Sequence, residues 1–216
     1  MGEQLQTFFS STAGKVLVIA IIIVVLAFIL KGNKKEEKPV DVKALTISSL
    51  LIALSVILGN IKIFEMPQGG SITLMSILPI VLCGYLLGTK RGVLAGICVG
   101  LLNLIFGPYI IHPVQLFLDY PIAYGALGLS GLVSNSKNGL TKGYLIGLAG
   151  RYICAFLSGW IFFGAYAPES FNAVTWSLWY NFTYLAAEGI LTIIIINIPS
   201  VKKAFQSLKT QIKTQI

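Results

Sequence analysis

Long apolar runs separated by short charged loops limit what this chain can fold into more than any other feature of its sequence. The hydrocarbon core of a membrane is about 30 Å thick, so a helix needs about 20 mainly apolar residues to cross it. Seven segments come near that length: 16–30, 44–61, 72–88, 92–106, 116–133, 143–165 and 178–198. The sequence therefore predicts an all-α integral membrane protein with seven transmembrane helices.

Sparse charge supports a membrane setting. Only 11% of the 216 residues are charged, whereas a soluble domain carries about 25%. So few charges cannot cover a surface that faces water, and the lipid bilayer is the expected surrounding. The formal net charge of +8 would suggest nucleic acid as the partner of a soluble protein. Here the basic residues lie in short loops between apolar runs, so we expect no nucleic-acid partner.

The first apolar run, residues 16–30, has two interpretations. It is short enough for a secretory signal, but only Lys15 precedes it as a basic residue and no small-residue cleavage site follows. A group of lysines follows instead, as in a stop-transfer sequence. We therefore expect a retained helix, with residues 1–43 forming an extra transmembrane helix and a basic cytoplasmic linker. Residues 44–198 would form a six-helix membrane domain, and 199–216 a polar, basic cytoplasmic tail that is amphipathic and frayed.

The basic residues also predict the topology. Thirteen of the sixteen lie on alternate loops and in the tail, at positions 31, 34, 35, 38, 43, 90, 91, 137, 142, 202, 203, 209 and 213. Cytoplasmic loops carry an excess of lysine and arginine. Seven crossings then place the N-terminus outside and the C-terminus in the cytoplasm, in the cell membrane.

A polar cluster interrupts the apolar sequence on the predicted outer side. Within sixteen residues lie Tyr109, the single histidine His112, Gln115, Asp119, Tyr120 and Tyr124. Such a cluster either lines a cavity or faces a protein neighbour. An ionised carboxylate at the centre of a membrane helix costs about 2.5–3.5 kcal/mol, so Asp119 and Glu188 should face an interior or a cavity.

Several polar residues leave alternatives open. Asn181 and Glu188 are seven residues apart, hence on one face of a helix, which favours a lined cavity. Arg151 should pair with Asp119 or Glu188, with direct substrate contact as the alternative. His112, before a proline, is either a helix cap and packing residue or a ligand and proton-relay residue. The outer tyrosines and tryptophans either form an interfacial belt or stack on a ligand.

The sequence contains few of the residue patterns that enzymes use for catalysis. The sequence has no nucleophile–base pairing, no H-E-x-x-H motif, no phosphate-cradling glycine loop and no paired metal ligands. The cysteines at 83, 98 and 154 stand singly inside apolar runs and suit packing. We expect a non-enzymatic protein without a cofactor or a metal.

Three segments carry a family resemblance: MPQGGSIT (66–73), YIIHPVQLFLDYPIAYGALGLSGL (109–132) and GAYAPES…WSLWYNFTYLAAE (164–188). Together they resemble the thiamine-specific S-components of energy-coupling factor (ECF) vitamin transporters, over residues 44–198. The resemblance implies a six-helix bundle that binds a vitamin in an outer cavity, with the first helix as an addition. It also implies, as partners, a transmembrane coupling subunit and two cytoplasmic ATPases that supply energy by toppling the S-component.

The resemblance also implies residue roles. Tyr109, Tyr120 and Asn181 match ligand-contacting positions, and Ser49 and Ala53 match positions that contact the coupling subunit. In the resulting hypothesis Asp119 or Glu188 neutralises the cation. Tyr109, Tyr120 and Trp176 stack on the rings of the vitamin, and Asn181 forms a hydrogen bond with a ring nitrogen. Glu65 and His112 complete the set of expected substrate-binding residues.

Four departures from the family pattern bear on the identity of the vitamin. Ala155 stands where relatives have a histidine, Phe163 where they have a tryptophan, and Trp176 where they have a tyrosine. An acidic residue has no counterpart between Thr73 and Met75, and Glu65 or Glu188 could replace it. A different aromatic vitamin or precursor therefore stays an alternative to thiamine, as does a non-transporting membrane scaffold.

Overall fold

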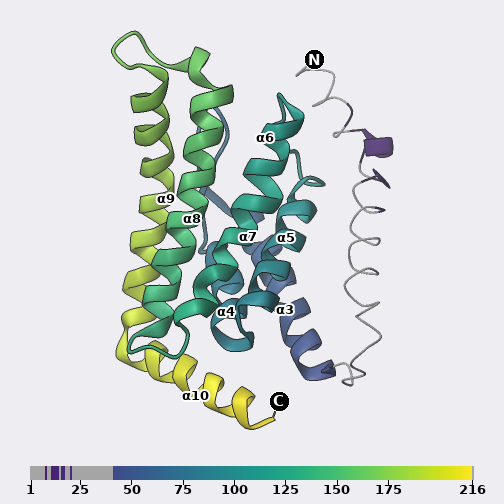
Figure 1. Ribbon diagram of the computed structural model, residues 1–216, viewed down its shortest axis with the longest axis vertical. Coiled ribbons are helices and arrows are strands. Elements are labelled where there is room, and N and C mark those ends of the chain that lie inside the picture. The colour runs from purple at the N-terminus through teal and green to yellow at the C-terminus, as the bar shows by residue number, and fades with distance from the viewer. Residues whose placement is uncertain (1–7, 9–10, 15, 18–19, 21–40, 216) are drawn as a thin grey trace.

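The computed structural model describes residues 8, 11–14, 16–17, 20 and 41–215, so the first expected helix lies almost wholly outside the described residues. The long helices α8 (Gly139–Phe162) and α9 (Ala173–Asn197) lie side by side, and α10 (Pro199–Gln215) crosses beneath them (Figure 1). The other elements are α3 (Val42–Asn60), β1 (Lys62–Glu65), β2 (Ser71–Thr73), α4 (Ile77–Leu87), α5 (Thr89–Asn103), α6 (Pro113–Phe117), the π-turn η1 (Leu118–Ile122), α7 (Ala123–Leu127), and the 3₁₀ turns η2 (Gly128–Val133) and η3 (Gly164–Tyr166).

Four helical spans are long and apolar enough to cross a membrane: α3, the combined span Pro113–Val133, α8 and α9. Large apolar side chains such as Leu50, Ile190 and Ile194 stay exposed on them, as lipid-facing residues do. The mainly helical, multi-pass architecture is thus confirmed. The total of seven crossings remains a prediction.

Residues 62–73 correct the expected all-α fold. Strands β1 and β2 pair antiparallel, with Phe64 opposite Ile72, where we expected a loop and then the start of a helix. Gly69 and Gly70 form the turn with φ angles of 86° and 83°, a region that favours glycine. Because Ile72 and Thr73 are used in strand pairing, α4 starts only at Ile77.

The expected helix 116–133 is one span with three geometries. Pro121 has no backbone N–H to donate to the preceding turn, and the helix widens there into the π-turn η1. It then returns to α-helix at Ala123 and tightens into the 3₁₀ turn η2. The widened turn carries Asp119 and Tyr120, and so it sets the direction of both side chains.

Glycines bring α5 close to this span. A Cβ on Gly96 would overlap the carbonyl oxygen of Tyr124, and one on Gly100 would overlap that of Tyr120. Only glycine allows two backbones to approach this closely.

The tail is a regular helix, so the prediction of a frayed end is wrong. Ile212 of α10 is buried, and the Lys209 ammonium lies 4.2 Å from the centre of the Tyr85 ring. Lys202 donates to the Asn138 side chain at 2.8 Å, which ties α10 to the loop before α8. The same end of the bundle holds an ion pair between Arg91 and Asp41 at 3.3 Å. The basic loops thus gather at one end.

Candidate functional site

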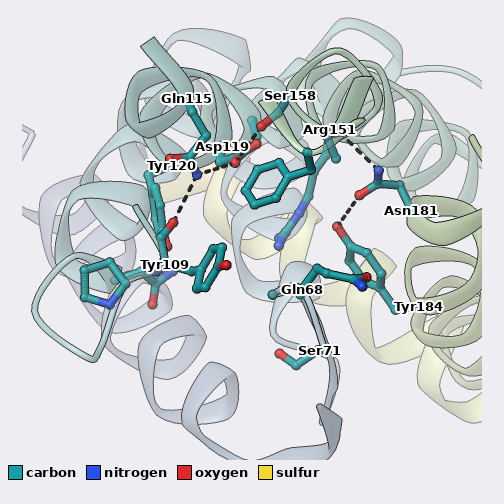
Figure 2. A pocket seen from close by; sticks show the side chains of 18 of the residues that line it. Gln68, Ser71, Tyr109, Gln115, Asp119, Tyr120, Arg151, Ser158, Asn181 and Tyr184 are labelled. Atoms are coloured by element: carbon teal, nitrogen blue, oxygen red, sulfur yellow. Dashed lines mark hydrogen bonds between the residues drawn. The ribbon is translucent and has the colours of Figure 1, made fainter. Parts of the chain in front are cut away.

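A cavity of about 220 Å³ lies at the end of the bundle opposite the basic loops. Its walls come from the end of α3, the hairpin turn, the loop after α5, the span α6–α7, the C-terminal half of α8 and the N-terminal half of α9. Figure 2 shows Asp119 with Gln115 and Ser158 on one side, Asn181 and Tyr184 on another, and Arg151 between them. Ligand pockets for drug-sized molecules measure about 300–1,000 Å³, so a small nutrient suits this volume.

One wall holds a fixed carboxylate. Asp119 Oδ2 accepts hydrogen bonds from Gln115 Nε2 at 2.6 Å and from Ser158 Oγ at 2.7 Å. Gln115 is itself buried, and its Nε2 also donates to the Tyr109 carbonyl at 3.0 Å. The Tyr120 hydroxyl accepts from the Tyr109 backbone N–H at 2.9 Å. Both bonds to Asp119 use Oδ2, and among the described residues none donates to Oδ1, which leaves that oxygen for a ligand.

The α9 wall carries an amide and a row of rings. Asn181 Nδ2 donates to the Ser177 carbonyl at 2.9 Å and the Ala155 carbonyl at 3.2 Å. Its Oδ1 accepts from the Tyr184 hydroxyl at 3.0 Å. The ring centres of Trp176 and Tyr180 lie 5.4 Å apart, and those of Tyr180 and Tyr184 lie 6.3 Å apart. An aromatic surface therefore runs along one side of the cavity.

The hairpin turn forms a further wall of the cavity. The Tyr180 hydroxyl donates to the Gly69 carbonyl at 2.9 Å and accepts from the Gln68 backbone N–H at 2.8 Å. Beside the turn, where a Cβ on Gly69 would lie 3.7 Å from the Cβ of Tyr109, the rings of Tyr109 and Phe163 stack at 5.7 Å. A hydrogen bond with the Tyr166 side chain, and then burial, raises the pKa of Tyr109, so its phenol stays neutral at physiological pH.

Arg151 does not pair with either intramembrane acid, so that prediction is wrong. Ion pairs in the described part of the chain join Lys62 to Glu65 and Arg91 to Asp41. The Arg151 guanidinium instead lies 4.1 Å from the centre of the Tyr124 ring, and Nη2 donates to the Tyr124 hydroxyl at 3.3 Å. The prediction failed because Asp119 is held by Gln115 and Ser158, while Glu188 binds other donors.

Glu188 lies outside the cavity. Its buried carboxylate accepts from the Thr73 hydroxyl at 2.7 Å, the Thr73 N–H at 3.1 Å and the Ile77 N–H at 3.2 Å. Glu188 and Asn181 share a face of α9, as predicted. Glu188 lies two turns further along the helix, at a distance of about 10 Å from Asn181. Glu188 therefore fastens α9 to β2 and to the start of α4.

Two further expected site residues lie away from the cavity. His112 Nδ1 accepts from the Val114 N–H at 3.2 Å and caps α6, and its ring stacks on Phe162 at 4.9 Å. The cap-and-packing interpretation of His112 is thus confirmed. Glu65 is exposed on β1, where it pairs with Lys62.

The aromatic residues that we expected on the outer side divide between the two interpretations. Trp176 and Tyr180 line the cavity, whereas Trp179, which is 57% exposed, and Tyr166 do not. Sequence reasoning missed Ser158 and Tyr184 as lining residues. Ser158 stands seven residues after Arg151, so a polar repeat along α8 was available as a signal.

A multi-pass helical bundle with a cavity lined by a carboxylate, a guanidinium and aromatic rings is a membrane protein built to bind a small molecule. The family model described as "Thiamine transporter protein" matches residues 45–207, and the chain belongs to that family.

Individual relatives agree with this membership. The chain is 36% identical over 164 residues to "Thiamine transporter ThiT" of Bacillus subtilis (strain 168), covering 68% of this chain and 85% of that protein. It is 31% identical over 139 residues to the protein of the same name from Lacticaseibacillus paracasei, covering 56% of this chain and 69% of the relative. The solved structure of ThiT from Listeria monocytogenes shares the fold, with a TM-score of 0.65 and 23% identity over 76% of this chain and 97% of that one.

Proposed function

We propose that this protein captures thiamine for uptake, as the substrate-binding S-component of an ATP-driven ECF transporter. Family membership and the names of the two bacterial relatives support thiamine as the substrate. The observation that carries the proposal is the open Oδ1 of Asp119 in a cavity that aromatic rings also line. Thiamine joins a cationic thiazolium ring to an aminopyrimidine, and such a wall offers both a counter-charge and ring faces.

The geometry suggests a role for each lining residue. Asp119 neutralises the thiazolium, while Trp176, Tyr109 and Tyr120 enclose the two rings. Asn181 acts through its oxygen: its Nδ2 protons are already donated within the protein, so Oδ1 accepts from the amino group of the pyrimidine. We assign no substrate contact to Glu65, His112 or Glu188.

We also propose the orientation and the partners. The basic end faces the cytoplasm, which places the cavity toward the outside, the N-terminus outside and the C-terminus inside. Ser49 and Ala53 are exposed on α3, and the Ser49 hydroxyl folds back onto the Leu45 carbonyl at 3.0 Å. They leave a smooth strip of small residues for a helix of the coupling subunit, which would connect the protein to two ATPases. Residues 44–198 would form the binding domain, with 1–43 and 199–216 as additions.

Calorimetric titration of the purified protein with thiamine tests the proposal. Thiamine should bind, and Tyr120→Ala and Asn181→Ala should each weaken binding at least about tenfold, because each removes a wall residue and leaves polar groups unpaired. Trp179→Ala, an exposed aromatic outside the cavity, is the matched control and should not change the affinity. Binding of another aromatic vitamin in place of thiamine would support the alternative substrate. No binding of any vitamin would support the scaffold.

A further inference from the structure

A surface of lysines lies at the end of the bundle away from the cavity, where α10 crosses beneath α8 and α9 (Figure 1). It is formed by Lys137 in the loop before α8, Lys142 in the first turn of α8, and Lys202 and Lys203 in α10. We infer that this lysine surface binds an anionic phospholipid, with the head-group phosphate at the lysines and the acyl chains along α8 and α9. The surface is separate from the cavity, so the inference does not depend on the proposed substrate.

The segments that form the lysine surface are neighbours in space. Lys202 Nζ donates to the Asn138 side chain at 2.8 Å, and the Lys142 backbone N–H donates to the Asn138 carbonyl at 3.0 Å. Asn138 therefore links a lysine of α10 to a lysine of α8. Lys137 directly precedes Asn138, and Lys203 directly follows Lys202. These lysines are thus carried by one region of the surface.

The segments around the lysine surface carry no negative side chain. Residues 120–168 and 189–216 contain no aspartate or glutamate. None of the lysines of this surface belongs to an ion pair in the described part of the chain. An ammonium has three N–H donors, and Asn138 accepts one from Lys202. Like charges held close together repel one another, and an anion from outside the protein relieves that repulsion.

The lysine surface lies at the depth of lipid head groups. The Thr141 hydroxyl donates to the Asn197 side chain at 3.2 Å, so the start of α8 is level with the end of α9. Leu145, one turn after Lys142, is 49% exposed, and Ile198, directly before α10, is 43% exposed. Large apolar side chains exposed at the ends of membrane spans contact lipid tails, and a lysine one turn away reaches the head-group layer. One lipid molecule therefore meets both apolar contacts and a positive charge.

Helix α10 adds to this setting. It follows α9 with only Ile198 between them, so it begins where a membrane span ends. Phe205 packs against the bundle core and Ile212 is buried, whereas Lys203 is exposed. An amphipathic helix in this position lies in the head-group layer, where each lysine strengthens attachment to anionic lipid by about a factor of five. These apolar neighbours favour a lipid over an acidic protein as the partner.

Lipid titrations of the full-length protein in a neutral detergent test the inference. The ligands are dioctanoylphosphatidylglycerol, phosphatidylcholine with the same acyl chains, and inorganic phosphate, and the readouts are bound lipid by native mass spectrometry and the shift in Tm. Wild-type protein should bind the phosphatidylglycerol at least about tenfold more tightly than the phosphatidylcholine. Added salt should weaken this binding, because the attraction is electrostatic.

Two double variants define the site. Lys137→Gln combined with Lys142→Gln breaks no side-chain hydrogen bond in the described structure, and it should weaken phosphatidylglycerol binding at least about tenfold. The matched control combines Lys43→Gln on α3 with Lys90→Gln on α5, which removes the same charge from the same end of the bundle. The control should change the affinity less than about threefold.

Each contrary result overturns the inference in its own way. Equal binding of the two lipids by wild-type protein would overturn it without any variant, and would leave an acidic protein surface as the alternative partner. Equal losses in the two double variants would show attraction by the overall charge of this end instead of a defined site. A rise in Tm with inorganic phosphate as large as that with phosphatidylglycerol would make this a site for simple anions.

Discussion

Two carboxylates, Asp119 on the cavity wall and the buried Glu188 on α9, should respond to neutralisation in opposite ways. Asp119→Asn removes the charge that faces the cavity but keeps an oxygen for Ser158 and Gln115. It should therefore weaken thiamine binding by about 1.5–3 kcal/mol, or roughly 10–150-fold, the contribution of a hydrogen bond to a charged group. Its effect on the unfolding free energy should stay below about 1 kcal/mol, because the neutral amide still accepts.

Glu188→Gln should act on stability instead. One carboxylate oxygen of Glu188 accepts the Thr73 N–H and the other accepts the Ile77 N–H. In either orientation of the glutamine amide that replaces Glu188, its NH₂ group would face one of these two backbone N–H donors. That donor is fixed by the backbone and would lose its acceptor. A buried donor without an acceptor, together with the lost charge, should cost about 2–4 kcal/mol, or roughly 5–15 °C in Tm for a chain of this length.

The test measures two quantities on each variant: the Kd for thiamine by calorimetry, and the Tm by thermal unfolding in detergent. The reasoning predicts a binding loss with little change in Tm for Asp119→Asn, and a lower Tm with little change in Kd for Glu188→Gln. A tenfold loss of affinity in Glu188→Gln at a temperature where it is folded would refute the placement of Glu188 outside the site. An unchanged Kd in Asp119→Asn would refute the role of the cavity carboxylate.

Two further predictions concern packing and assembly. Gly96→Ala should lower the unfolding free energy by about 1–3 kcal/mol or more, because the added methyl overlaps a backbone carbonyl that cannot move aside. Gly59→Ala, whose methyl would meet only ordinary contact at 3.7 Å, should be neutral, and equal Tm values for the two variants would contradict this. Ser49→Trp should prevent co-purification with a coupling subunit and its ATPases while leaving thiamine binding intact. Ile194→Trp, on an exposed face of α9, should permit co-purification, and loss with both variants would argue against a specific α3 contact.

What could be read from the sequence depended on local information. Membrane-crossing runs follow from hydropathy over about 20 residues, and the close approach at Gly96 follows from a glycine repeat on one helix face. The turn at Gly69 and Gly70 also follows from local information, namely the pair of adjacent glycines. The strands around that turn were not, because Phe64 and Ile72 are apolar residues that suit a membrane helix equally well, and pairing between them is a tertiary event.

The cavity required distances that periodicity does not provide. A repeat of 3.6 residues placed Asn181 and Glu188 on one face correctly, but it says nothing about depth, and only the first reaches the cavity. Likewise, a lone Arg151 among apolar residues predicts a partner. Opposite charge makes Asp119 and Glu188 the expected partners, whereas the structure places the ring of Tyr124 there. The side chain was singled out correctly and its neighbour was not.

Helix α9 holds the hairpin at two independent levels, and for this reason we expect experiment to separate the effects of the two carboxylates. Glu188 binds the end of β2 through Thr73, while Tyr180, eight residues earlier, binds both sides of the turn through Gln68 and Gly69. When the Glu188 contacts weaken, the two Tyr180 bonds still fix the turn against the cavity, because both are made to backbone atoms of the turn itself. The base of the hairpin therefore contributes to the cohesion of the bundle, and its turn contributes to the shape of the binding cavity.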